Sequence, residues 1–237
     1  MPSPVTPPAN ATAYLNLEAQ PGWTANDSSS IGPHPLVIKN IVQVTPPPIQ
    51  PPTTLTFETQ GTPGDWCDVM YTPKAIAIPE GPYAVLIRTT VIFNDAINAN
   101  FESGFRATNV NGITNNGEFQ FVPLANTQYK EMEFDVVPGP NGGWKDTSLR
   151  FPTFLVGPAN AIEYYATADS NNTLSPQYIS VNGNLQAIPA SCQNLLGGKQ
   201  SPLWALLKAV PAFQIDANTK AVLLRHQVTM SVYFWPV

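Results

Sequence analysis

Three carboxylates alternate along one short segment, "YKEMEFDVVPG" at residues 129–139. Glu131, Glu133 and Asp135 are separated by single residues, so in an extended strand all three lie on one face. Carboxylates at positions i and i+2 of a strand are roughly 7 Å apart, and those at i and i+4 roughly 13 Å. Glycoside hydrolysis uses a pair of carboxylates at separations of this order. The spacing therefore identifies these three residues as the candidates for enzymatic chemistry.

The segment partly resembles the E-x-D-x-x-E signature of family 16 β-jelly-roll glycoside hydrolases. The resemblance implies that Glu133 matches the nucleophile and Asp135 the assisting residue. The position of the acid/base glutamate is occupied by Pro138, which removes the proton donor that retaining hydrolysis requires. Alternation of acidic with apolar residues is also typical of a solvated strand face, and we favour this second interpretation.

The remaining reactive residues do not form a recognisable site. His34 lies between two prolines and His226 on the apolar face of the last strand-like segment, so neither is placed beside a nucleophile. Two Cys and two His scattered over the chain are too few for a zinc site. Cys67 and Cys192 could form one disulfide, but two buried thiols are the simpler interpretation. We therefore expect no catalytic residue, no metal site and no cofactor.

Tryptophans in loops offer a route to binding, because an exposed ring can contact a sugar or a partner. Trp66 and Trp144 lie in the Gly/Pro-rich segments "TPGDWCD" and "NGGWKD". A loop tryptophan also commonly fills a gap in its own sandwich, so both interpretations stay open.

Composition argues against nucleic-acid binding. Charged residues make up 11% of the chain, the net charge is -5, and the 11 Lys and Arg form no basic run. The segment "MPSPVTPPAN" has neither the basic nor the apolar region of a signal peptide, and no stretch approaches the roughly 18 apolar residues of a membrane span. We expect a soluble protein without a classical export signal, in which the sequons at Asn10, Asn26 and Asn171 are unused.

Two parts of the chain differ in composition. Residues 1–52 hold 12 of the 26 prolines and are expected to form an extended arm, in which the apolar stretch "PHPLVIKNIVQV" lies along a surface. Residues 53–237 are expected to form one domain of short strands separated by Gly, Pro and Asn clusters. The expected strands are 53–59, 83–93, 103–110, 117–122, 129–137, 149–156, 161–168, 177–188 with a turn at "NGN", and 221–235.

About nine strands with almost no helix predict an all-β fold, an antiparallel β-sandwich of jelly-roll type. One short helix is expected at residues 201–210, where Ser201 caps the first turn, Pro202 takes its first position and Pro211 ends it.

The last strand-like segment, residues 221–235, is apolar on one face and too adhesive for an exposed sheet edge. We therefore expect it to be paired on both sides, with Val228, Met230, Val232 and Phe234 in the core.

The proline-rich arm, the strand pattern and the closing "VYFWPV" together resemble a single jelly-roll capsid protein of an icosahedral virus. The resemblance implies a structural shell protein that self-assembles into a virion through protein–protein contacts, after synthesis in the host cytoplasm. Its partners would be copies of itself, other capsid proteins, an internal membrane or a host receptor. Because the first 38 residues lack Lys and Arg, little direct nucleic-acid binding is implied. The alternatives are a carbohydrate-binding or glycoside-hydrolysing β-jelly-roll protein, and a non-viral structural or adhesion module.

Overall fold

The computed structural model describes the strand-forming parts of the chain, and every structural statement below refers to them. They are residues 2–14, 23–27, 37–41, 54–61, 66–71, 82–93, 99–109, 114–123, 132–136, 145–152, 158–170, 173–193, 204–209, 212–215 and 222–237.

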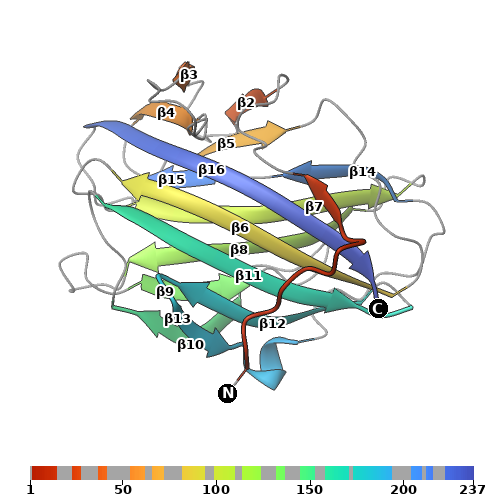
Figure 1. Cartoon of the computed structure of the whole chain (residues 1–237). Coiled ribbons are helices and arrows are strands. Elements are labelled where there is room, and N and C mark those ends of the chain that lie inside the picture. Colours follow the sequence, from red (N-terminus) through yellow and green to blue (C-terminus); the bar gives the residue numbers. More distant parts are fainter. Residues whose placement is uncertain are drawn as a thin grey trace, which may run out of the picture.

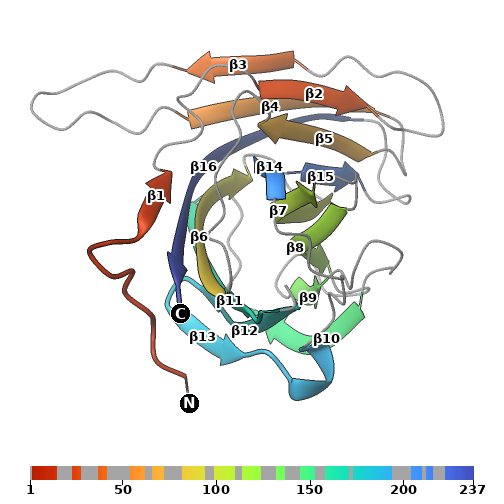
Figure 2. The same cartoon turned by 90° about the vertical axis from the view of Figure 1, so that its right-hand side faces the viewer.

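Two antiparallel sheets form a sandwich (Figures 1 and 2). Sheet A follows the order β13 (Asn184–Ala187), β12 (Leu174–Val181), β11 (Ala159–Ala168), β6 (Tyr83–Phe93), β16 (Val222–Pro236), β4 (Thr54–Gly61) and β3 (Val37–Ile41), with β1 (Thr12–Tyr14) pairing with β16. Sheet B follows the order β10 (Lys145–Phe151), β9 (Met132–Val136), β8 (Thr114–Pro123), β7 (Ala99–Asn109), β14 (Trp204–Ala209), β5 (Trp66–Tyr71) and β15 (Ala212–Ile215), with β2 (Trp23–Asp27) pairing with β5. The expectation of an all-β antiparallel fold is confirmed.

The core lies between the two sheets and follows from period-two alternation. In β11, every second residue from Asn160 to Ala168 is buried, and the residues between them are exposed or half-buried. Tyr164 of β11 meets Phe119 of β8 with ring centroids 4.8 Å apart. Phe121 of β8 packs edge-to-face on Phe151 of β10 at 5.6 Å. Each fully buried side chain of this size stabilises the fold by roughly 1.5–3 kcal/mol.

The final strand lies inside sheet A. β16 pairs with β6 from His226 to Pro236 on one side, and with β4 and then β1 on the other. Val232 and Phe234 are fully buried. The expected two-sided pairing is confirmed, as are the core positions of these two residues, whereas the side chains of Val228 and Met230 lie outside the described part.

The helix expected at residues 201–210 is wrong. Trp204–Ala209 form β14, which pairs with β7 and β5. Leu, Ala and Lys favour a helix by only a few tenths of a kcal/mol each, so pairing with strands on both sides overrides the local preference. A short 3-10 helix occurs elsewhere, at Ala190–Cys192. In the described ranges there is no helix of the length and apolarity that a membrane span requires.

Three of the described strands belong to the proline-rich residues 1–52. β2 pairs with β5, and β3, which was expected to lie along a surface, pairs with β4 at the end of sheet A. Residues 2–14 run across the outside of sheet A and end in β1 (Figures 1 and 2). Peripheral positions suit a proline-rich segment, since proline cannot donate to a sheet ladder. The domain boundary at residue 52 stays a prediction.

Candidate functional site

A trough of about 490 Å³ lies on the outer face of sheet A, which is the face turned away from sheet B. It crosses the strands from β13 to β16. Its lining includes Pro4, Arg88, Glu163, Ser180, Leu185 and Ser231. Most of these side chains are polar, and they come from the amino-terminal segment and five different strands.

Strand register explains why distant residues meet in the trough. Ser180 of β12 lies opposite Leu185 of β13 and opposite Glu163 of β11. Glu163 in turn lies opposite Arg88 of β6, and Arg88 opposite Ser231 of β16. Residues directly opposite one another in antiparallel strands share a face of the sheet. The pairing therefore builds a continuous row of polar side chains across four strands, from β12 to β16, with Leu185 of β13 at its end.

An ion pair fixes the centre of this row. Arg88 Nε lies 2.9 Å from Glu163 Oε2, and the Tyr178 hydroxyl donates to Glu163 Oε1 at 2.6 Å. The Arg88 guanidinium also lies over the Tyr233 ring, 5.4 Å from its centroid. The arginine side chain is 45% exposed and the glutamate 19%, so the pair faces solvent on one side and adds little to stability.

Burial and the contacts with Glu163 shift the pKa values of Arg88 and Tyr178. Burial lowers the pKa of Arg88, but the hydrogen bond and charge of Glu163 outweigh it, so the net shift is upward. Burial, followed by the hydrogen bond to Glu163, raises the pKa of Tyr178 well above its ordinary value. At neutral pH the row thus presents a charged guanidinium and a phenol in fixed orientations.

A row of aromatic rings runs beside the trough. Tyr178, Tyr165 and Tyr233 occupy the next register row along the strands, roughly 7 Å from the Arg88–Glu163 row. Tyr165 stacks on Trp235 with centroids 6.0 Å apart and 13° between the planes, and lies 5.3 Å from Tyr178. Sequence reasoning missed these rings. Consecutive aromatics such as Tyr164 and Tyr165 were a signal, because neighbours in a strand point to opposite faces.

Two of the three acidic candidates lie on the other sheet. Glu133 and Asp135 belong to β9, and Glu131 lies outside the described residues. Glu133 is opposite Arg150 of β10, and Asp135 is opposite Gln120 of β8 and Asp146 of β10. Asp135 is thus in register with Gln120, which alternates with the core residues of β8.

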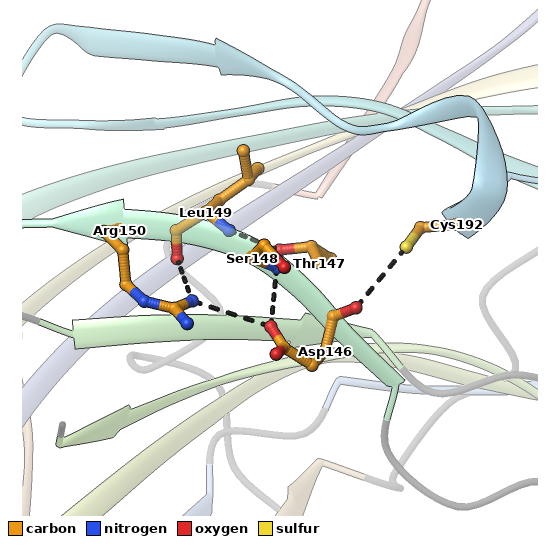
Figure 3. Close-up of polar contacts among 6 residues, drawn as sticks. All are labelled: Asp146, Thr147, Ser148, Leu149, Arg150 and Cys192. Carbon is orange, nitrogen blue, oxygen red and sulfur yellow. Dashed lines mark hydrogen bonds and ion pairs between the residues drawn. The ribbon is translucent and has the colours of Figure 1, made fainter. Parts of the chain in front are cut away.

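A bulge in β10 is hydrogen-bonded to the carboxylate of Asp146, the residue opposite Asp135 (Figure 3). Thr147 and Ser148 are extra residues between Asp146 and Leu149 in the ladder with β9, and Ser148 has a φ of 60°. Asp146 Oδ1 accepts from Ser148 N at 2.5 Å and lies 3.6 Å from the Arg150 guanidinium. This carboxylate thus stabilises the bulge.

Only some of the other sequence candidates lie in the described part of the chain. His34 and Trp144 lie outside the described residues, and His226 lies in β16. Trp66 is the first residue of β5 and pairs with β15, so its assignment to a loop is wrong because a partner strand extends it. Within the ranges given above, no three His, Cys, Asp or Glu side chains lie close enough to hold a metal ion.

Of the two cysteines, Cys67 lies in β5, and its side chain is not described. Cys192 is a free thiol with 1% of its surface exposed. The prediction of a buried thiol is confirmed for Cys192.

No protein-family model and no curated protein matches this chain. Its fold is nevertheless similar to that of solved structures. Alginate lyase vAL-1 from Chlorella virus has a TM-score of 0.54 and 9% identity, over 84% of this chain and 90% of that one. The globular domain of T. cruzi calreticulin has a TM-score of 0.52 and 8% identity, over 95% and 89%.

The carbohydrate esterase vb_24B_21 from bacteriophage phi24B has a TM-score of 0.48 and 13% identity, over 96% of this chain and all of its own. At such identities the similarity establishes the fold alone. The chain is a β-sandwich of jelly-roll type, as the strand pattern predicted.

Proposed function

We propose that this protein binds carbohydrate in the trough on the outer face of sheet A. The observation that carries the proposal is the pairing of two kinds of side chain on one face. The fixed Arg88–Glu163 pair and nearby hydroxyls offer donors and acceptors for sugar hydroxyl groups. Beside it, the half-buried rings of Tyr165 and Tyr233 offer flat apolar surface for the C–H faces of sugar rings.

Binding without catalysis agrees with the bonding of Glu163. Both of its carboxylate oxygens accept hydrogen bonds, from Tyr178 and from Arg88. Protein donors therefore hold both oxygens of this carboxylate in place. We therefore assign Glu163 to binding and orientation.

The fold is compatible with this function, since one of the similar structures is an enzyme of alginate. A shared fold carries no activity by itself, so the proposal depends on the trough. The shell function, the virion location and the partners implied by the capsid resemblance stay predictions. Sedimentation of the purified chain tests them, because a shell protein forms large particles and a binding protein a small species.

Binding is tested by calorimetry with the dimers and hexamers of two named series, cello-oligosaccharides and alginate oligosaccharides. We expect one series to bind, and Arg88→Met to weaken its binding about tenfold to a hundredfold. That range corresponds to the roughly 1.5–3 kcal/mol of a hydrogen bond to a charged group. Stability should change by less than about 1 kcal/mol, because the ion pair is half-exposed.

The matched control is Arg150→Met, which removes an arginine that is also paired with a carboxylate but lies on sheet B. It should leave the affinity unchanged. If Arg150→Met or Glu133→Gln abolishes binding while Arg88→Met does not, the binding face is on sheet B and the proposal is wrong.

A further inference from the structure

The amino-terminal segment lies across the aromatic row. Residues 2–9 cross the outside of sheet A from the β12 side toward β16 (Figures 1 and 2). Ala11 N then donates to Pro8 O in a turn, and β1 pairs with Val232–Phe234 of β16. The segment is thus held by backbone hydrogen bonds at its β1 end, and it lies on the outer face of sheet A that also carries the trough.

Residues 2–9 also contribute to the lining of the trough and to the apolar surface beside it. Pro4 forms part of the lining of the trough. Val5 packs with Ala11 against a small apolar cluster of Ala84, Leu86 and Trp235 on the outer face of sheet A. Trp235 is 7% exposed, although it points away from the main core. The segment therefore packs against the cluster that contains Trp235, one ring of the stacked Tyr165–Trp235 pair.

The sequence limits how firmly residues 2–9 can be held. Four of these eight residues are prolines, which have no N–H to donate to a sheet ladder. Val5 N donates to the Tyr178 hydroxyl at 2.9 Å, and this same hydroxyl donates to Glu163. Residues 2–9 are thus linked to the Arg88–Glu163 row by one hydrogen bond, which goes to the Tyr178 hydroxyl. Their other contacts with sheet A are apolar.

We propose that residues 2–9 cover a second sugar subsite, formed by Tyr165 and Trp235, and that a long oligosaccharide displaces them. This inference rests on the proposed function of the trough. The register rows of Tyr165 and Trp235 lie roughly 7 and 14 Å from the Arg88–Glu163 row. A disaccharide in the trough leaves the cover in place, whereas a hexasaccharide reaches the rings and competes with it.

Displacement of the cover reduces the apparent affinity for the longer ligand, in proportion to the fraction of molecules with the subsite open. The test compares the full chain with a variant that lacks residues 2–9 and retains β1. Calorimetry uses cellobiose and cellohexaose, and the dimer and hexamer of alginate. We expect equal affinities of the two proteins for the dimer, and about tenfold tighter binding of the hexamer by the truncated variant.

A second variant keeps the chain at full length. Tyr178→Phe removes the oxygen that accepts from Val5 N and retains the ring, so hexamer binding should tighten a few-fold. The same substitution in the chain that lacks residues 2–9 is the control, because there it removes only the bond to Glu163. Amide exchange gives an independent readout, because the hexamer should accelerate exchange at Val5 and the dimer should not.

The outcomes separate the two proposals. Equal hexamer affinities for full-length and truncated protein, with the dimer bound by both, overturn the cover and leave carbohydrate binding in place. Faster exchange at Val5 with the dimer also overturns it. If neither protein binds any of the four oligosaccharides, the proposed function fails, and the inference fails with it.

Discussion

A chain that lacks residues 222–237 is expected to be unfolded. β16 pairs with β6 along most of its length and with β4 and β1 on its other side, so its loss divides sheet A. It also removes Phe234, whose ring lies 6.1 Å from that of Tyr83 in the core. A single buried Phe is worth about 3–5 kcal/mol, which is a large share of the roughly 5–15 kcal/mol that stabilises a typical domain.

Circular dichroism and urea titration of the truncated chain check this expectation. The variant lacking residues 2–9 is the control, because it removes peripheral residues and retains every strand of both sheets. We expect cooperative unfolding for the control and none for the chain without β16. A cooperative urea transition in the latter would show that the two sheets do not depend on their shared closing strand.

Raising the pH above about 10 is expected to destabilise the protein steeply. Burial raises the pKa of Tyr83, Tyr164 and Tyr178 well above the ordinary value of 10.0. The neutral phenol is the form favoured in the folded state, so the associated stability is complete below pH 10. It is lost as the pH rises toward the folded-state values, because the unfolded chain releases protons that the folded chain retains.

The size of this effect follows from three buried phenols. Each phenol lowers the free energy of unfolding by about 1.4 kcal/mol per pH unit. The slope of that free energy against pH therefore approaches about 4 kcal/mol per unit above pH 11. Urea titrations at pH 8, 10, 11 and 11.5 measure it. Tyr164→Phe should lower the slope by about a third after its own stability at pH 8 is subtracted. A slope that is the same in the variant and the parent would contradict this origin.

Strands with a strong alternating pattern were predicted well from the sequence. The expected strand 83–93 coincides with β6, and 161–168 lies within β11. The turn expected at "NGN" is present, with Asn182 and Gly183 both at positive φ. These segments combine β-branched and aromatic residues on a buried face, so local preference and tertiary environment agree.

Other elements depend on partners that are distant in sequence. The segment at Trp204–Ala209 has a helical composition and becomes a strand only because β7 and β5 flank it. β10 begins at Lys145, four residues before the expected start, because the bulge at Thr147 and Ser148 interrupts the alternation that marks a strand.

The trough could not be predicted for a related reason. Arg88, Glu163, Ser180 and Ser231 are unremarkable polar residues in four separate strands, and each alone is typical of a solvated face. They become a site through strand register, which a single sequence does not specify. The acidic candidates Glu133 and Asp135 were noticed because they are close together in the sequence. A sequence pattern detects only residues that are near one another along the chain.

The bulge in β10 also bears on how this protein behaves at high concentration. β10 ends the strand order of sheet B, and an open edge of that kind is a template for a strand from another molecule. Here the edge is kinked, and two of its carbonyls are occupied: Gln186 Nε2 donates to Arg150 O, and Cys192 Sγ donates to Asp146 O. A neighbouring chain that approached β10 would find an irregular ladder with acceptors already in use, so the bulge protects the protein against edge-to-edge aggregation.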